Sequence, residues 1–328
     1  MTTSALVSGS LRTTLPLAPR PPVAVAAVIV NAAKFDGGSL GRFRAAVDRA
    51  FIARGLVAPF WLPTSADSTG AAQAHEAIRR GADLVLVAGG DGTIRTVGQE
   101  LAGTGVALAL LPIGTGNLLA RNLGIPRNEV DVAVHIAVHG TDQAMDVGWA
   151  RIDRHGDGRL LEDYAFLVMG GAGFDAATMA GASSALKRRL GSAAYVLSGA
   201  LASRDPMVET TVSVDGVTRH AAQSHGIVVG NHGSLTMGLS LLPEAACDDG
   251  RLDAVVLLQR TPLDWLSTLW SVAAHDQRGS RRMPHVHGRE IDIRSSVPVP
   301  VEVDGDVVGE ARRIRFRVQQ QALHVRSA

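Results

Sequence analysis

Residues 84–92 read LVLVAGGDG and are followed by Thr93 and an apolar-periodic run. A short, continuously apolar segment that ends in glycines and an aspartate is typical of a buried parallel strand entering a tight turn. Open α/β sheets place their ligands at the carboxyl ends of such strands. Glycines allow the backbone close to a bulky group, and the amides that begin the next helix, at about residues 93–102, suit an anion. The stretch predicts a phosphate-binding turn in a nucleotide-using enzyme.

Length and composition limit the class of protein. A chain of 328 residues is expected to form two domains. Hydrophobic residues make up 46% of the chain, enough to fill real cores, whereas aromatic residues make up only 4%, which argues against stacking platforms for single-stranded nucleic acid. The formal charge is +1, so a nucleic-acid partner is not expected. Cys247 is the one cysteine of the sequence, which excludes a disulfide framework and fits a reducing cytosol.

The N-terminal segment carries no targeting signal that we can identify. Residues 1–21 are rich in Ser, Thr and Pro and lack a compact apolar region, so we expect a flexible leader and not a signal peptide. The longest apolar runs, such as Val23 to Val30, are far shorter than the roughly 20 residues that cross a bilayer. We expect a cytoplasmic protein without a transmembrane segment.

Strands and helices alternate strictly in the first half, from residue 22 to residue 145. This alternation predicts a doubly wound parallel sheet. Besides the quoted stretch, the expected strands lie at 23–30, 60–62 and 106–111, and the expected helices at 40–54, 73–80, 93–102, 118–123 and 130–138.

The second half is mainly antiparallel β, a sandwich or barrel, and residues 146–311 are the expected second domain. The segment 312–328 is expected to return to the first domain. An exposed strand edge in the second half would let two copies pair as a homodimer. Expected strands lie at 145–152, 164–169, 208–214, 226–229, 252–258, 291–294, 299–303, 314–318 and 323–325, with helices at about 176–203 and 262–275.

A second glycine-rich turn, GTGN at residues 114–117, follows the strand at 106–111. In a doubly wound sheet this second glycine turn can lie beside the first glycine turn, residues 89–93, and both can form one pocket for a phosphate chain. Neither is a P-loop or a dinucleotide fingerprint. Two ordinary tight turns are the competing explanation, which is much weaker for the pair than for either turn alone. Asp91 could order its turn, contact a ribose or base, or act through magnesium.

The two turns resemble known motifs. GGDGT with Ile94, and PIGTGNLLARNLGIP at 112–126, are similar to the nucleotide-binding motifs of the diacylglycerol kinase catalytic domain family. That family includes bacterial diacylglycerol kinases, other bacterial lipid kinases and sphingosine kinases, and NAD kinases and phosphofructokinases are more distant. The resemblance continues through DVG at 146–148, LLPEAACDDGRLD at 241–253 and VDGD at 303–306. It implies an α/β nucleotide domain and a C-terminal β-sandwich domain with the active site between them.

The chemistry implied by the resemblance is transfer of the ATP γ-phosphate to a lipid hydroxyl at the membrane surface, with ATP and Mg²⁺ as cofactors. The metal is expected at Asp249 with backbone oxygens of Ala246 and Arg251, ligands that suit a hard cation. A solvated turn is the alternative for this loop. By resemblance, the ATP-binding residues are Asn31, Lys34, Thr64, Gly89, Gly90, Asp91, Gly92, Thr93, Ile94, Arg95, Thr96, Gly114, Thr115, Gly116, Asn117 and Arg188.

The catalytic candidates implied by the resemblance are Asp304 and Asp306. The family pattern is Asp-Gly-Glu, with the glutamate as the proposed general base, and here Asp306 takes that place with one methylene less. A carboxylate remains that could work directly or through a water, although the segment also reads as an ordinary hairpin turn. Ala32 and Leu118 also depart from the family pattern. We expect altered geometry without loss of ATP binding.

Three functions remain open from the sequence. The first is a lipid kinase that is associated with the membrane surface during turnover, with diacylglycerol as the expected acceptor and a sphingoid base or another lipid alcohol as the alternative. The second is a soluble NAD-kinase-like enzyme. The third is a nucleotide- or lipid-binding protein with impaired catalysis. The apolar, β-rich second half and the turn at 304–306 favour the lipid kinase.

Two features of the segment after residue 173 have competing explanations. Arg188, in a cationic run at 187–189, could contact phosphates, but such a run also fits a solvated helix face. Asp175 could orient the acceptor hydroxyl, or it could simply begin a helix.

Overall fold

The computed structural model describes residues 23–65, 68–114, 116–127, 129–159, 161–173, 207–233, 242–258 and 284–328. The helices expected at 176–203 and 262–275 lie outside these ranges, as do Thr115, Asp175 and Arg188.

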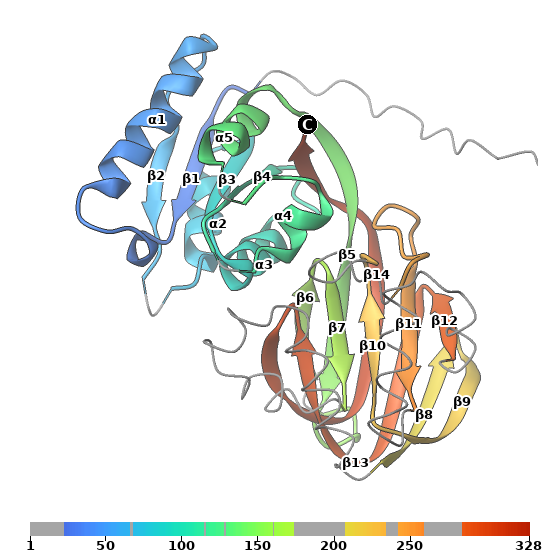
Figure 1. The fold of residues 1–328 in the computed structure, drawn as a ribbon. Coiled ribbons are helices and arrows are strands. Elements are labelled where there is room, and N and C mark those ends of the chain that lie inside the picture. The colour runs from blue at the N-terminus through green and yellow to red at the C-terminus, as the bar shows by residue number, and fades with distance from the viewer. Residues whose placement is uncertain are drawn as a thin grey trace, which may run out of the picture.

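The first part of the chain is built on a parallel sheet (Figure 1). Its strands are β1 (Ala26–Val30), β2 (Phe60–Pro63), β3 (Leu84–Gly89) and β4 (Ala107–Pro112), in the order β4-β3-β1-β2. Every residue of β1, β3 and β4 is buried. Such continuously apolar strands are stable because helices cover both faces of a parallel sheet.

The helices of this part pack in two pairs. Helix α1 (Ser39–Ala53) contacts α5 (Val130–His139), and α2 (Ala71–Arg79) contacts α3 (Asp91–Leu101). Right-handed crossovers put the two pairs on opposite faces of this strand order. The 3₁₀ turn η1 (Ala32–Lys34) and α4 (Leu118–Asn122) are short additions at the carboxyl ends of β1 and β4.

The second part is almost entirely β-structure (Figure 1). Two strands, Leu161–Phe166 and Met169–Ala172, replace the one strand expected at 164–169, because the chain bends at residues 167–168. The last strand pair is longer than expected, since bulges join segments that the sequence separates. The strands are β5 (Thr141–Asp153), β6 (Leu161–Phe166), β7 (Met169–Ala172), β8 (Val208–Val214), β9 (Val217–Ser224), β10 (Gly226–Gly230), β11 (Leu252–Leu257), β12 (His285–Gly288), β13 (Glu290–Val303) and β14 (Asp306–Ser327).

Strand β14 connects the two parts. It pairs antiparallel with β13 and β5, and near its end His324 and Val325 pair in parallel with Ala107 and Leu108 of β4. The 14 strands of the described ranges therefore form one continuous sheet. This pairing supports the proposal that residues 312–328 return to the first domain.

Helix α3 fixes the two parts against each other by a close contact. A Cβ at Gly98 would lie 2.9 Å from Leu167 Cδ1, so only glycine allows this approach without a shift. The Gln99 side chain accepts a hydrogen bond of 3.0 Å from Ala165 N in β6. The helix that begins at the first glycine turn is thus packed directly on the second part.

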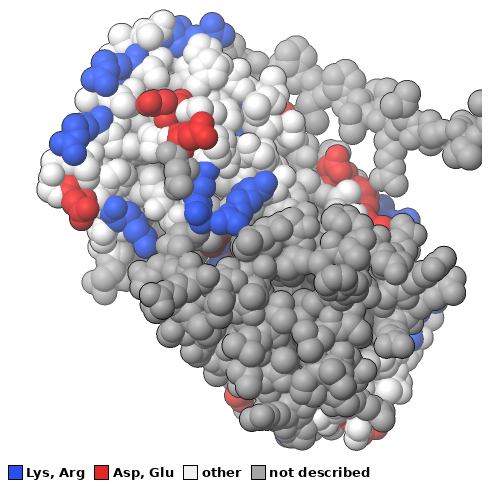
Figure 2. Space-filling model, viewed as in Figure 1, with Lys and Arg blue, Asp and Glu red and all other residues white. Residues whose placement is uncertain are grey.

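Charges of both signs are interspersed over the α/β part on the face shown in Figure 2. This agrees with the formal charge of +1. Within the described ranges, no helix has the length and apolar character that crossing a membrane requires.

Candidate functional site

The two glycine turns lie side by side, as expected. A Cβ on Gly114 would lie 2.6 Å from Gly90 Cα and 3.4 Å from Gly89 O, and a Cβ on Gly89 would lie 2.8 Å from Thr93 Cβ. A side chain at Gly114 would collide with the backbone of the first glycine turn, and one at Gly89 would collide with the Thr93 side chain. The glycines bring the carboxyl ends of β3 and β4 together at one edge of the sheet.

Asp91 ties the two turns together. Its Oδ2 accepts a hydrogen bond of 2.7 Å from Asn117 N, and its Oδ1 accepts one of 2.6 Å from Leu118 N. A Cβ at Gly116 would overlap Asp91 Oδ2. A carboxylate at the start of α4 satisfies amides that the helix leaves unpaired. Of the three explanations for an acidic residue here, the contacts favour the ordering of the turn.

Asn117 stabilises the second glycine turn through a hydrogen bond of its buried side chain. It is fully buried and has a φ of 49°, a left-handed conformation that asparagine tolerates. Its Nδ2 donates a hydrogen bond of 2.7 Å to Gly114 O. Its Oδ1 is buried and has no hydrogen-bond partner in the described part of the chain, and buried acceptors are normally paired. A polar acceptor is therefore left unsatisfied beside the pocket.

The ends of β1 and β2 lie at the same edge of the sheet. Asn31 N donates to Ala88 O at 2.9 Å, and Thr64 N donates to Val30 O at 2.9 Å. Asn31 Oδ1 accepts a hydrogen bond of 3.2 Å from Ala33 N and caps η1, which ends at the exposed Lys34. Asn31 therefore lies next to the end of β3, while Thr64 follows the neighbouring strand β2 and Lys34 ends η1.

The start of α3 is open to an anion. Gly90 caps the helix without a side-chain hydrogen bond. A Cβ at Gly90 would meet nothing closer than 3.8 Å, and one at Gly92 nothing closer than Asp306 Oδ2 at 3.3 Å. Free amides at a helix N-terminus favour a phosphate. Ile94 differs from its neighbours because its side chain is buried and its N–H donates to Gly90 O.

Asp306 lies over this helix start although it comes from the far end of the chain. The turn between β13 and β14 carries it there, and its Oδ2 accepts a hydrogen bond of 2.9 Å from Arg95 Nη2. The side chain of Arg95 is 14% exposed and that of Asp306 is 50% exposed. The candidate base is therefore beside the first glycine turn and accessible to solvent.

Asp304 is buried and its carboxylate is fully engaged. It accepts hydrogen bonds from Leu167 N at 2.7 Å and from Val168 N and Met169 N at 2.9 Å. Burial raises the pKa of Asp304 to about 6, while these three hydrogen bonds and the Arg95 charge act in the opposite direction. These contacts hold the hairpin turn against the bend between β6 and β7, and so position Asp306.

The loop expected to bind a metal, residues 246–251, is called the acidic loop below and is held in place by Asp146. Asp146 Oδ2 accepts a hydrogen bond of 2.6 Å from Gly250 N, and its Oδ1 accepts one of 2.7 Å from Gln321 N. Burial, with the nearby charges of Asp249 and Asp248, raises the pKa of Asp146 above its ordinary value. Asp249 Oδ1 accepts from Arg251 N at 2.9 Å. Carboxylates that repel one another in this way favour a cation, and their oxygens suit a hard one.

The acidic loop is not a complete metal cage by itself. The described ranges contain no group of at least three His, Cys, Asp or Glu side chains arranged to hold a metal ion. The expected set, one carboxylate of Asp249 with backbone oxygens of Ala246 and Arg251, fits a cation that keeps several waters, as Mg²⁺ does.

Sequence analysis missed Asn231 and His232. Asn231 is fully buried, and its Nδ2 donates to Asp146 O at 2.8 Å and to Leu167 O at 3.1 Å. His232 N donates to Val168 O at 3.1 Å. They therefore link the acidic loop to the segment that Asp304 caps. A polar pair directly after the apolar strand at 226–230 was the available signal.

His232 is expected to make the protein sensitive to acid. Burial lowers its pKa to about 4, against the opposing charge of Asp248. As the pH falls below about 6.5, the unfolded chain binds a proton at this histidine that the folded chain does not bind. The free energy of unfolding should therefore fall between about pH 6.5 and pH 4, by up to about 3 kcal/mol.

Urea unfolding of His232→Gln and of wild type across this pH range measures that contribution. The difference in unfolding free energy between the two proteins should change with pH in the stated direction. His287→Gln on β12 is the control, since His287 is exposed. A pH-independent difference for His232→Gln would show that the histidine is protonated equally in both states.

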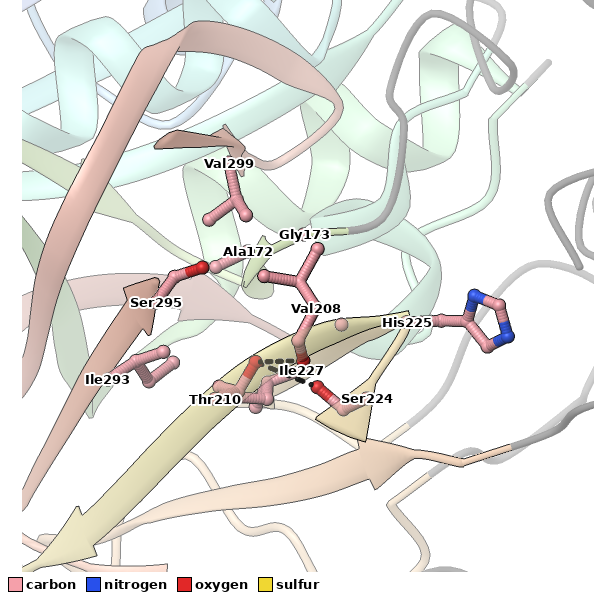
Figure 3. A pocket seen from close by; sticks show the side chains of 11 residues that line it. Ala172, Gly173, Val208, Thr210, Ser224, His225, Ile227, Ile293, Ser295 and Val299 are labelled. Carbon is pink, nitrogen blue, oxygen red and sulfur yellow. Dashed lines mark hydrogen bonds between the residues drawn. The ribbon is translucent and has the colours of Figure 1, made fainter. Parts of the chain in front are cut away.

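A small apolar cavity lies within the second part (Figure 3). Ala172, Val208 and Val299 are among its lining residues, and Ser224 Oγ donates to Thr210 Oγ1 at 3.1 Å at its edge. Its volume is about 10 Å³, which is roughly the space of one water molecule. The cavity is therefore too small for an acyl chain in this structure.

Comparisons with known proteins agree with this architecture. Residues 26–150 match the model of the diacylglycerol kinase catalytic domain, and residues 169–327 match that of the YegS C-terminal NAD kinase beta sandwich-like domain. A protein named probable lipid kinase YegS-like, from Pseudomonas putida, is 32% identical over 254 residues, which cover 76% of this chain and 79% of that relative.

Solved structures show the same fold. A diacylglycerol kinase from Bacillus anthracis superposes with a TM-score of 0.68 at 20% identity, over 94% of this chain and 98% of the other. A yeast NADH kinase complexed with NADH superposes with a TM-score of 0.50 at 12% identity, over 93% of this chain and 84% of the other. The expected fold class, an α/β domain followed by a β-sandwich domain, is confirmed.

The two matching family models and the relative, on a fold with paired glycine turns, place the chain in a kinase family. Within that class, the chain belongs to the YegS-like lipid kinases, whose first domain is the diacylglycerol kinase catalytic domain. The family resemblance drawn from the sequence motifs is thereby confirmed.

Proposed function

We propose that the protein is an ATP- and Mg²⁺-dependent lipid kinase that phosphorylates diacylglycerol to phosphatidic acid. One observation carries this proposal: the carboxylate of Asp306 lies beside the open N-terminus of α3, between the two domains of the chain. A carboxylate and a glycine turn that are far apart in the sequence thus lie beside each other. Phosphoryl transfer needs this combination of positioning and charge stabilisation.

The glycine turns are proposed to bind the triphosphate. Gly90 at the start of α3 leaves room for a bound group, and Asp91 fixes the second glycine turn beside it. Asn31, Lys34 and Thr64 would bind the nucleotide from the neighbouring strand ends. Thr115 and Arg188, also expected to contact ATP, lie outside the described residues.

Asp306 is proposed to take the proton of the acceptor hydroxyl. The hydroxyl oxygen then forms a bond to the γ-phosphorus, the bond from that phosphorus to the oxygen bridging to the β-phosphate breaks, and ADP leaves with that electron pair. Solvent removes the proton from Asp306 before the next turnover. Asp304 has no free carboxylate oxygen for this step, so we assign it the positioning of the base.

Magnesium is proposed to be held at the acidic loop by Asp249 and the backbone oxygens of Ala246 and Arg251. A bound Mg²⁺ would supply positive charge that offsets the charge developing on the phosphates. Asp146 would keep the loop in place through Gly250 N. Asn231 would fix Asp146 from the other side through its backbone oxygen.

Diacylglycerol is the proposed acceptor because the relatives are named lipid kinases and a structural neighbour is named a diacylglycerol kinase. Such an acceptor would be met at a membrane surface, and we propose a cytoplasmic enzyme that associates with the membrane during turnover. A homodimer formed through the exposed edge strand β9, which pairs only with β8 in the described ranges, remains a prediction.

Radiolabelled ATP offered with single acceptors in mixed micelles tests this function. We expect label in phosphatidic acid when diacylglycerol is present, and loss of that label when Mg²⁺ is chelated. A sphingoid base is the alternative lipid acceptor, and NAD without lipid tests the soluble alternative. Label in NAD alone would overturn the lipid kinase, and ATP binding without labelled product would indicate a binding protein.

A further inference from the structure

Arg95 lies between two carboxylates that come from the other domain. Its Nη2 donates to Asp306 Oδ2 at 2.9 Å, and its charge acts on the buried Asp304. The side chain is 14% exposed, and its Nε is buried without a hydrogen-bond partner among the described residues. A cation that is nearly buried and incompletely paired has spare capacity for another anion.

The position of Arg95 in α3 directs its side chain toward the phosphate-binding edge. Helical side chains point back toward the helix N-terminus and cover the preceding turn. Arg95 therefore reaches over Gly92, three positions earlier, where the absent side chain leaves room. The guanidinium thus lies along the turn where an anion would approach the free amides of α3.

Asp306 occupies this same region. A Cβ at Gly92 would lie 3.3 Å from Asp306 Oδ2, so the carboxylate sits against the first turn of α3. Helix N-termini attract anions of any kind, carboxylate or phosphate. Asp306 and a bound phosphate group would therefore compete for one helix end and one arginine.

Resting on the proposed function, we propose that Arg95 exchanges partners during the reaction. Before nucleotide binds, it pairs with Asp306. When the terminal phosphoryl group of a nucleoside triphosphate arrives at the start of α3, Arg95 pairs with that group and releases the Asp306 carboxylate. The guanidinium keeps its proton and its charge in both pairings, so only the partner changes.

Two consequences follow for the enzyme. While Arg95 Nη2 donates to Asp306 Oδ2, that carboxylate oxygen is engaged in the ion pair and is less available to an acceptor hydroxyl. Release by the phosphoryl group makes the base available only when the donor is in place. Arg95 is thus a positioning residue that couples nucleotide binding to the readiness of Asp306.

A double-mutant cycle on ATP affinity tests the exchange. The Kd of Mg-ATP is measured by calorimetry for the full chain as wild type, Arg95→Gln, Asp306→Asn and the double variant. Asp306→Asn should bind ATP about 5- to 10-fold more tightly than wild type, because Arg95 is freed from a partly exposed ion pair. Arg95→Gln should bind it about 10-fold more weakly. Adding Asp306→Asn to Arg95→Gln should change the affinity less than about twofold.

The cycle separates this proposal from its alternatives. If Asp306→Asn tightens binding equally with and without Arg95, simple charge repulsion explains the gain and the exchange is overturned. A merely structural pair would weaken ATP binding in both single variants, which also overturns it. Arg151→Gln and Asp163→Asn form the control cycle, since this pair on β5 and β6 is also an ion pair, joined by two hydrogen bonds, and neither variant should affect the Kd.

Failure of the underlying function would look different. A wild-type chain that binds no ATP, or transfers no phosphate to lipid, overturns the proposed function together with the exchange. A wild-type chain that does both, with an additive cycle, overturns the exchange alone.

Discussion

Replacing Asp306 by Asn should lower lipid phosphorylation by about 100- to 10,000-fold, the usual contribution of a general base. The amide is nearly isosteric with the carboxylate but cannot accept the hydroxyl proton. Binding of ATP should be retained, because the glycine turns remain intact. Initial rates at saturating ATP and lipid, with ATP affinity measured separately, check both statements.

The glutamate variant is the matched control for this experiment. Asp306→Glu keeps the carboxylate and restores the side-chain length expected from the family pattern, so it should keep most of the turnover. Thermal unfolding of each variant tests whether the β13–β14 turn stays folded, since Asp304 holds this turn through three hydrogen bonds. Full activity in Asp306→Asn would place the base elsewhere.

Replacing Asp91 by Ala should weaken ATP binding by at least about 100-fold. Its carboxylate makes two hydrogen bonds to backbone amides that hold the second glycine turn beside the first. Hydrogen bonds to charged groups are worth about 1.5–3 kcal/mol each, and every 1.4 kcal/mol corresponds to about tenfold in Kd. Without them, the second glycine turn is free to move away from α3.

Calorimetric titration with Mg-ATP measures this effect, and urea unfolding shows whether the variant folds cooperatively. Asp91→Asn should lie between wild type and Asp91→Ala, because the amide keeps one acceptor oxygen. Asp163→Ala on β6 removes an exposed carboxylate and should leave the affinity unchanged. An Asp91→Ala variant with wild-type ATP affinity would contradict the paired-turn pocket.

Much of the α/β part could be predicted from the sequence. Continuous apolar runs identify β1, β3 and β4 because both faces of these strands are buried. The rule that ligand-binding turns share the carboxyl edge of a parallel sheet places the two glycine turns together. Helix α3 begins at Asp91 and not at residue 93, because Gly90 is already extended enough to cap it.

The second part was less predictable. Polar residues between short apolar segments suggested separate strands, but β13 and β14 each continue through bulges. A bulge leaves residues unpaired without ending the strand. The alternation of apolar and polar residues is interrupted there, and it no longer shows that the strand continues. The bend at residues 167–168 is equally hidden, because the groups that satisfy its amides belong to Asp304, far along the chain.

The different environments of Asp304 and Asp306 could not be read from the sequence. Both residues belong to one hairpin turn, yet the first is buried and the second is half exposed. Which carboxylate faces the interior depends on the segment at 167–169 that packs against the turn. The pairing of Arg95 with Asp306 could not be predicted from the sequence either, because the two residues are 211 positions apart.

Both glycine turns and the β13–β14 turn are proposed to form a single ATP site. Hydrogen–deuterium exchange of the full chain with and without Mg-ATP tests it directly. We expect slower exchange in peptides that cover residues 89–94 and 113–118, together with altered exchange in the peptide that covers residues 304–308. Protection confined to one glycine turn, or found only outside these three segments, would contradict the claim.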